Sequence, residues 1–196
     1  MGFTRKTEYY TGVVYEYNLP TGHSCPGALE CLVTVNRETG KATNDSIAYR
    51  CYAAPAERFP GVRESRWNNF ENARAGILTQ LPAPAVAVRI HSSGDFFSQK
   101  YFDMWLEFCK HYPQVDFWAY TKSLPYWVKR LEGIPPNLVL TASVGGRHDA
   151  LISKHDLRSA TVVTTASLPE GAPVDTNDDL ARTAGPSFYL MDNFEK

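Results

Sequence analysis

Short apolar runs recur along the second half of the chain with longer amphipathic stretches between them. The runs at 85–90 (AVAVRI), 115–120 (VDFWAY), 137–142 (NLVLTA) and 161–165 (TVVTT) predict strands, and an earlier run at 11–18 (TGVVYEYN) predicts another. The four predicted strands of this half start near residues 85, 115, 138 and 161, which are 30, 23 and 23 residues apart. This interval is the length of a strand, a helix and two short loops. This spacing predicts a parallel α/β architecture.

The segments next to these strands carry apolar residues at the three-to-four spacing of helices. We predict helices over 98–112, 126–131 and 149–155, and one before the regular region over 65–78. Ser98 suits the N-cap of the first of these.

A hairpin is predicted ahead of the helical region. Two short runs of β-forming residues, 31–35 and 42–49, flank a turn signal at Gly40. A turn centred there pairs residue 31 with roughly residue 49, at the spacing of neighbouring strands. Cys31 and Cys51 are therefore expected within reach of each other.

Polar side chains gather directly after the regular strands. They are His91, Ser92, Ser93, Gly94 and Asp95 after the first, Thr121, Lys122 and Ser123 after the second, and Ser143, Arg147 and His148 after the third. Ligands of parallel sheets and barrels sit outside the carboxyl ends of the strands, so we expect these residues to converge on one site.

Length and composition are those of one folded domain. The 196 residues hold 43% hydrophobic and 13% aromatic side chains, which excludes a disordered chain. No apolar stretch is long enough to cross a bilayer and no leader pattern opens the chain, so we expect no membrane partner and a cytoplasmic location, in the host cell if the protein is phage-encoded. Within 1–196 we expect a cysteine loop and hairpin over 20–60, strand and helix units over 85–168, and an acidic tail over 170–196.

The near-zero net charge of -1 gives no overall attraction to nucleic acid, but the charges are unevenly distributed. Five arginines lie between Arg50 and Arg74, interleaved with aromatic residues, as on a surface that binds nucleic acid or phosphate. The alternative is a solvated helix face with paired charges.

Three of the four cysteines fall in the predicted loop and hairpin. Cys25, Cys31 and Cys51 are separated by five and nineteen residues, and three thiolates gathered there could hold a zinc ion or an iron–sulfur cluster. The alternative is that they are small buried apolar side chains. Cys109 lies on the apolar stripe of its predicted helix and is expected in the core.

Five longer motifs resemble a known family. The blocks HSCPGALEC, AYRCYAAPAERF, RIHSSGDFFSQKYFDMW, WAYTKSLPYW and LVLTASVGGRHD are similar to the gene-product-eighty-eight family of phage and actinobacterial proteins, over about residues 20 to 168. More distantly, the layout resembles radical S-adenosylmethionine enzymes, in which a three-cysteine loop after the first strand holds a 4Fe–4S cluster. The resemblance implies an incomplete parallel β/α barrel, and 196 residues are short for the full barrel of about 250.

The distant resemblance implies roles for particular residues. Cys25, Cys31 and Cys51 would hold the 4Fe–4S cluster, and Ser93, Gly94 and Asp95 would line the cofactor side. The remaining cofactor-side residues would be His91, Ser92, Thr121, Ser123 and Ser143. Lys122, Arg147 and His148 would be catalytic, contacting an anionic group of a small-molecule substrate. S-adenosylmethionine is the cofactor so implied, but the compact C-x3-C-x2-C motif is absent, which argues against it.

Two functions follow from these observations. The first is a radical or redox iron–sulfur enzyme. The second is a phage factor without catalytic activity, whose cluster is structural and whose Arg50 to Arg74 surface engages a host protein or nucleic acid.

Overall fold

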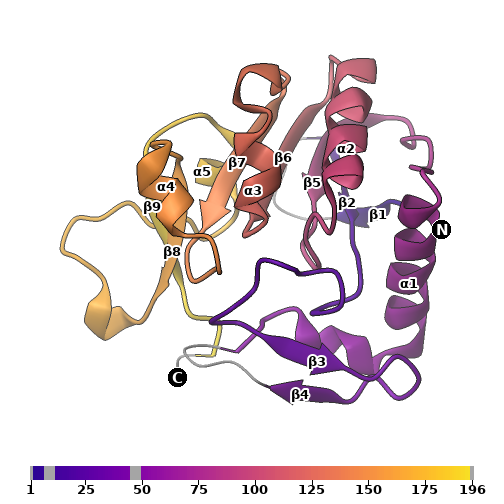
Figure 1. The fold of residues 1–196 in the computed structure, drawn as a ribbon, viewed down its shortest axis with the longest axis horizontal. Helices are drawn as coiled ribbons and strands as arrows, with labels where there is room; N and C mark the ends of the chain where they lie inside the picture. The colour runs from indigo at the N-terminus through magenta and orange to yellow at the C-terminus, as the bar shows by residue number, and fades with distance from the viewer. Residues whose placement is uncertain (1, 7–11, 45–49, 195–196) are drawn as a thin grey trace.

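A computed structural model describes residues 2–6, 12–44 and 50–194, and it is built around a seven-stranded sheet (Figure 1). The strands of this sheet run in the order β1-β2-β5-β6-β7-β8-β9. Their bounds are β1 Thr4–Lys6, β2 Val13–Tyr17, β5 Ala85–Ile90, β6 Asp116–Thr121, β7 Leu138–Ser143, β8 Ser159–Val163 and β9 Phe188–Met191.

All neighbouring strands of this sheet are parallel except β1 and β2, which are antiparallel. The predicted parallel α/β architecture is confirmed at this level. β1 and β9 stand at opposite edges, so within the described residues the sheet is open rather than a closed barrel.

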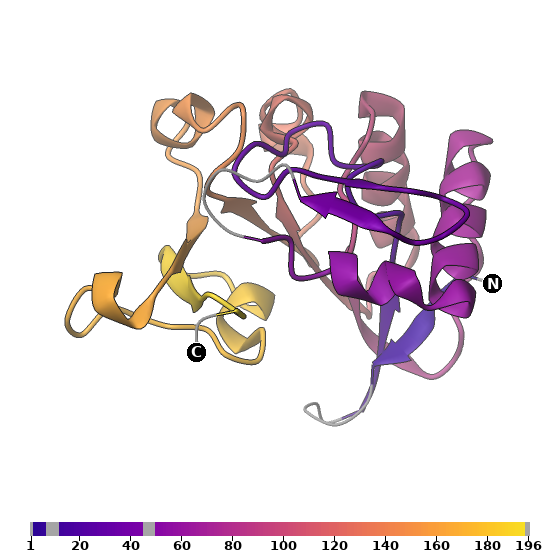
Figure 2. The same cartoon turned by 90° about the horizontal axis from the view of Figure 1, so that it is seen from below.

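Four helices cover one face of the sheet, α1 Pro60–Arg74, α2 Gln99–His111, α3 Leu124–Val128 and α4 Ala150–Lys154. The short helix α5, Asp179–Arg182, lies on the other side (Figure 2). Single 3-10 turns span Ala54–Arg58, Leu131–Gly133 and Thr165–Ser167. Among the described residues, no helix has the length and apolar character needed to traverse a membrane.

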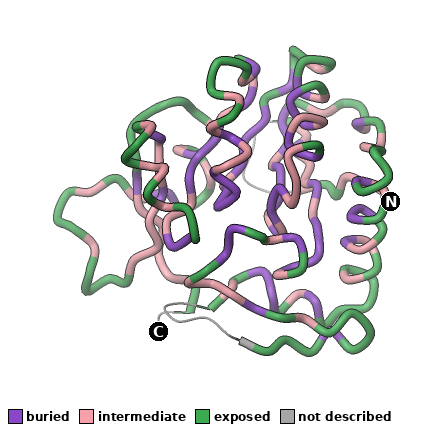
Figure 3. The backbone as a smooth tube through the Cα atoms, in the orientation of Figure 1, coloured by how far each residue is buried: buried purple, intermediate pink, exposed green. Residues whose placement is uncertain are grey.

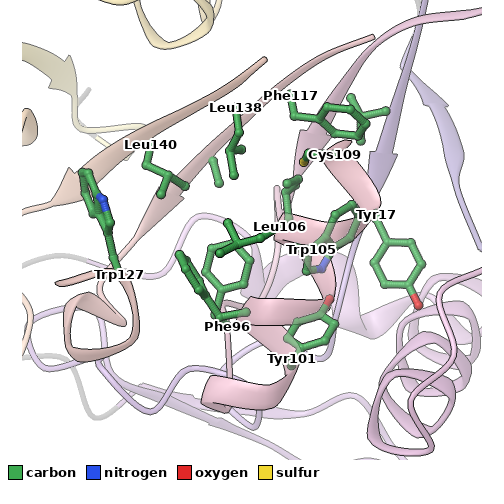
Figure 4. Close-up of a cluster of buried hydrophobic side chains, with 14 of the residues drawn as sticks. Tyr17, Phe96, Tyr101, Trp105, Leu106, Cys109, Phe117, Trp127, Leu138 and Leu140 are labelled. Carbon is green, nitrogen blue, oxygen red and sulfur yellow. The ribbon is translucent and has the colours of Figure 1, made fainter. Parts of the chain in front are cut away.

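The main core lies between the sheet and these four helices (Figure 4). Trp105 of α2 is fully buried there, in edge-to-face contact with Tyr17, and Phe96 and Phe102 pack beside it. The buried segments follow the strands and the inner side of α2 (Figure 3). Cys109 is buried in this cluster, as its place on the apolar stripe predicted.

The opposite face has a smaller core around α5. Ala181 packs there with Ala87, Trp118 and Phe188. The region predicted only as an acidic tail thus supplies α5 and the edge strand β9, which the sequence pattern did not reveal.

Helix α1 begins and ends earlier than the predicted 65–78. Pro60 occupies its first turn, where a missing N–H costs nothing. Gly76 ends it with a positive φ of 85°, and the Ile77 N–H returns to the Asn72 carbonyl. The prediction followed the apolar stripe that begins at Trp67 and so missed the proline-led first turn.

The predicted hairpin is present, with a different register. β3 Val33–Val35 pairs with β4 Ala42–Asn44 so that Val33 lies opposite Asn44, three residues short of the expected partner. The loop is tighter than predicted because Asn36 Oδ1 accepts the N–H groups of Glu38 and Thr39. Residues 45–49 of the predicted strand, including the expected partner of Cys31, lie outside the described residues.

Candidate functional site

The segment that contains Cys25 and Cys31 lies across the carboxyl ends of the central strands. Ala28 forms a β-bridge with Gly146, in the loop that follows β7. The Glu30 N–H donates to the Gly145 carbonyl at 2.9 Å, and the Arg147 N–H donates to the Gly27 carbonyl at 2.9 Å. We call residues 20–31 the cysteine loop. Its docking on the strand ends confirms that this edge of the sheet gathers distant segments.

Gly27 brings the cysteine loop into close contact with the backbone that follows β6. A Cβ atom at this position would lie 2.2 Å from the Lys122 carbonyl oxygen, so the loop would have to move away. We expect Gly27→Ala to lower the free energy of unfolding by about 1–3 kcal/mol in chemical denaturation. Gly61→Ala is the matched control, because a Cβ there meets nothing within 4 Å. Equal stabilities of the two variants would contradict the close docking.

The three cysteines of the loop and hairpin region are near one another. Cys25 lies within electrostatic range of Cys31 and Cys51, and Cys51 within range of Cys31. All four cysteines lie in the described part of the chain, and no disulfide joins any of them. Within the described ranges, no three His, Cys, Asp or Glu side chains close around a single metal ion.

Burial raises the pKa of Cys25 and of Cys51, so both are thiols in the protein alone. Backbone N–H groups of Ala53 and Ala54 act in the opposite direction on Cys51, because hydrogen bonds to sulfur favour the thiolate. The Gly22 backbone does the same for Cys25. The N–H groups needed to support thiolate ligands are therefore already in place.

Lys122 brings a buried amine to the same edge. Its Nζ donates to the Ser143 carbonyl at 3.1 Å, to Ser143 Oγ at 2.9 Å, and to the Val144 carbonyl. Burial lowers the pKa of Lys122, while the proximity of Cys31 and Asp149 acts in the opposite direction. Lys122 thus ties the end of β6 to the end of β7 and places a positive charge beside Cys31.

Asp95 connects the loops that follow β5 and β6. Its carboxylate accepts hydrogen bonds from the N–H of Phe96 at 2.7 Å, the hydroxyl of Thr121 at 2.6 Å and the N–H of Lys122 at 2.8 Å. Burial raises the pKa of Asp95, and these hydrogen bonds oppose that shift. Ser123 is buried nearby, with its hydroxyl on the Phe96 carbonyl.

The predicted cofactor-side serines hold the cysteine loop. Ser93 Oγ donates to the Leu19 carbonyl at 2.9 Å and lies 2.8 Å from Thr21 Oγ1. The backbone carbonyl of Ser92 accepts a hydrogen bond from the Tyr52 hydroxyl, in the segment after Cys51. Gly94 has a φ of 85°, and a Cβ there would lie 2.5 Å from Ser24 Oγ. This strand end therefore fits closely against the loop.

A buried ion pair connects the cysteine loop with the segment after Cys51. Glu57 Oε1 accepts the Thr21 N–H at 2.9 Å and Arg66 Nη1 at 2.7 Å, and the side chains are 1% and 9% exposed. Arg66 Nη1 also donates to the Ala53 carbonyl at 3.3 Å. One guanidinium from α1 thereby joins the two segments that carry the cysteines.

His91 lies in the aromatic core rather than at the strand-end site. Its φ of 65° interrupts the alternation of the strand and turns the side chain toward the helices. The ring contacts Phe96 and Trp105, and Nε2 lies 2.8 Å from the Tyr101 hydroxyl. The structure thus separates His91 from the other predicted cofactor-side residues.

Arg147 and His148 are exposed on the loop after β7. Arg147 contributes its backbone N–H to the cysteine loop. These two predicted catalytic residues stand at the rim, and Lys122 is the one that the structure buries at the site.

The arginines between Arg50 and Arg74 do not form one surface. Arg66 is buried, and Arg63 donates to the carbonyls of Glu57 and Glu38. Arg50, Arg58 and Arg74 remain exposed. A nucleic-acid surface here stays a prediction, with fewer arginines available than the sequence suggested.

Comparison with known proteins gives one match. The family model described as gene product 88 matches residues 3–192. No curated protein and no solved structure matches the chain.

Proposed function

The chain belongs to the gene product 88 family, and we propose that it is an iron–sulfur protein in which Cys25, Cys31 and Cys51 hold a 4Fe–4S cluster. The observation that carries this proposal is the mutual proximity of three cysteines from segments up to 26 residues apart, at the carboxyl edge of a parallel sheet. Iron–sulfur clusters are held by cysteine thiolates.

The donor set suits a cluster better than a single zinc ion. A four-iron cluster is larger than one ion, so its sulfur ligands stay farther apart, and here they come from separate segments of the chain. Structural zinc is held by four ligands, whereas three cysteines meet here. Three thiolates leave one iron open to a further ligand.

The charges around the cysteines favour the form of the protein that holds the cluster. Three thiolates bring negative charge into a partly buried site, and both Lys122 and Arg66 lie within electrostatic range of a cysteine. Thiols that are protonated in the protein alone must release protons when they bind iron. Cluster binding should therefore be weaker at low pH.

The bound cluster would supply one-electron redox chemistry at the strand ends. We further propose that the open, mostly parallel sheet is an incomplete β/α barrel of the kind found in the radical S-adenosylmethionine enzymes that the sequence resembles at a distance. The enclosing loops in this chain are Ser92–Asp95 and the cysteine loop, with Lys122 beneath them.

The test is anaerobic purification followed by iron and sulfide analysis and a visible spectrum. We expect about four irons and four sulfides per chain, with broad absorption near about 400 nm. Cys25→Ala should lose most of the bound iron, because a ligand is removed.

Cys109→Ala is the matched control, since the same atoms are removed from a buried cysteine of the core. It should keep the full iron content and lower the free energy of unfolding by about 1 kcal/mol. Stoichiometric zinc, absence of metal, or equal iron in the two variants would refute the proposal.

A further inference from the structure

A cavity of about 360 Å³ opens on the face of the sheet opposite α1 to α4. This face includes Arg89 of β5 and Tyr120 of β6, and the segment that leads into α5 forms part of the wall. The lining residues are Tyr52, Arg89, Tyr120, Ser143, Val162, Asp175, Thr176, Asp178, Leu190, Met191 and Asn193. Most of them were not among the predicted site residues, and we call this space the inner cavity.

Arg89 forms one wall of the inner cavity. Nη1 donates to Asp178 Oδ2 at 2.9 Å, and Nη2 donates to the Tyr52 hydroxyl at 3.2 Å. Lys6 also reaches Asp178 Oδ2, at 3.0 Å. Arg89 Nε is buried, and no acceptor within the described residues lies within hydrogen-bond reach of it. Nε is itself enclosed by protein, so Arg89 lines the cavity with the rest of its side chain.

Tyr120 contributes a loosely held polar group to the cavity. Its hydroxyl lies 3.5 Å from a carboxylate oxygen of Asp175 and 3.5 Å from one of Asp178. Asp175, in contrast, is 5% exposed and accepts the N–H groups of Ala181 at 2.9 Å and Asn177 at 3.2 Å. The carboxylate is fixed by the backbone, whereas the hydroxyl can turn to another partner.

Donors and acceptors thus stand side by side in one wall, and apolar side chains form another. Val162, Leu190 and Met191 supply the apolar part. A hydroxyl group has one donor and two acceptor positions, so it can bond to a carboxylate and a guanidinium at once. We propose that the inner cavity binds a small neutral polyhydroxylated molecule, a monosaccharide or a cyclic polyol, with its C–H face on the apolar wall.

A charged ligand suits this wall less well. A carboxylate ligand would face Asp175 and Asp178, and an ammonium ligand would face Arg89. A neutral polyol meets both signs without leaving a buried charge unpaired. A volume of about 360 Å³ is also at the small end of ligand pockets, which fits one sugar ring.

The inner cavity lies beside the cysteine site but does not depend on it. Tyr52 follows Cys51 directly in the chain, and none of the lining residues is a cysteine. Polyol binding is therefore expected with or without iron, and the two proposals fail separately.

The test is ligand-observed NMR with the full chain. D-glucose, D-ribose and myo-inositol at millimolar concentration are the polyol probes, and succinate and putrescine are the charged ones. We expect at least one polyol to bind and both charged probes to bind more weakly. Tyr120→Phe should weaken polyol binding roughly two- to tenfold, since one hydrogen bond is lost.

Two further variants control this experiment. Tyr126→Phe removes an equally long hydroxyl contact, 3.5 Å to the Phe97 carbonyl, outside the cavity and should leave binding unchanged. Val162→Phe fills the cavity and should abolish binding. No binding by any polyol, tighter binding of a charged probe, or equal binding by the Tyr120→Phe variant and the wild type would overturn the proposal.

Discussion

Glu57→Gln is expected to lower the free energy of unfolding by about 3–5 kcal/mol, because the substitution leaves the buried guanidinium of Arg66 without a counterion. The amide keeps the shape of the side chain and can still accept the Thr21 N–H. The loss of stability therefore measures the effect of removing the negative charge, not of changing the side-chain volume. Chemical denaturation of the purified variant measures it.

The same substitution at an exposed pair is the control. Glu71 forms an ion pair with Arg37 at 3.3 Å, and their side chains are 45% and 57% exposed, so Glu71→Gln should cost less than about 1 kcal/mol. Replacing both Glu57 and Arg66 by methionine should restore part of the lost stability, since no unpaired charge remains. A loss at Glu57 no larger than the loss at Glu71 would show that the buried pair does not hold the segments together.

The second large effect concerns pH. Burial lowers the pKa of His91 from 6.5 to about 3, so the folded protein keeps this imidazole neutral. Between these two pH values the unfolded chain binds more protons at this position than the folded chain does. The contribution of His91 to the free energy of unfolding is fully present above pH 6.5. It is lost as the pH falls toward 3, by about 1.4 kcal/mol per pH unit. The total is about 5 kcal/mol.

The measurement is the free energy of unfolding of wild type and of His91→Asn across this pH range. Asparagine does not titrate and tolerates the positive φ of 65° at this position. The stability of the variant should fall less steeply with acid than that of the wild type. His148→Asn, at an exposed histidine, should leave the wild-type slope unchanged. Parallel curves for wild type and His91→Asn would contradict a buried neutral His91.

Much of the architecture was predictable from local pattern. The strand β5 was predicted to the residue, and Ser98 caps α2 by accepting the Tyr101 N–H at 3.2 Å. These features depend on neighbours in the sequence, where periodicity and capping act. The residues after the strands were also placed at one edge of the sheet, because parallel strands bring their carboxyl ends together.

Individual side chains at that edge were harder to assign. Side chains alternate along a strand, so the pattern predicts His91 on the same face of the sheet as Arg89. The positive φ of His91 instead directs its ring into the main core. Arg66 looked like one of several surface arginines, since its partner Glu57 lies nine positions earlier, beyond the range of helical pairing. Arg89 stood in an apolar run that indicated burial but not the ion pair that makes burial of its charge tolerable.

The sequence by itself determined the parallel α/β class, the family, the N-cap of α2 and the common edge at which polar loops meet. Periodicity, capping residues and long motifs carry that information locally. The tertiary structure alone decided that Glu57 and Arg66 join the two segments that carry the cysteines, and that β9 and the segment before α5 line the inner cavity. These depend on contacts between residues far apart in the chain, whose charges are paired only once the fold has removed them from water.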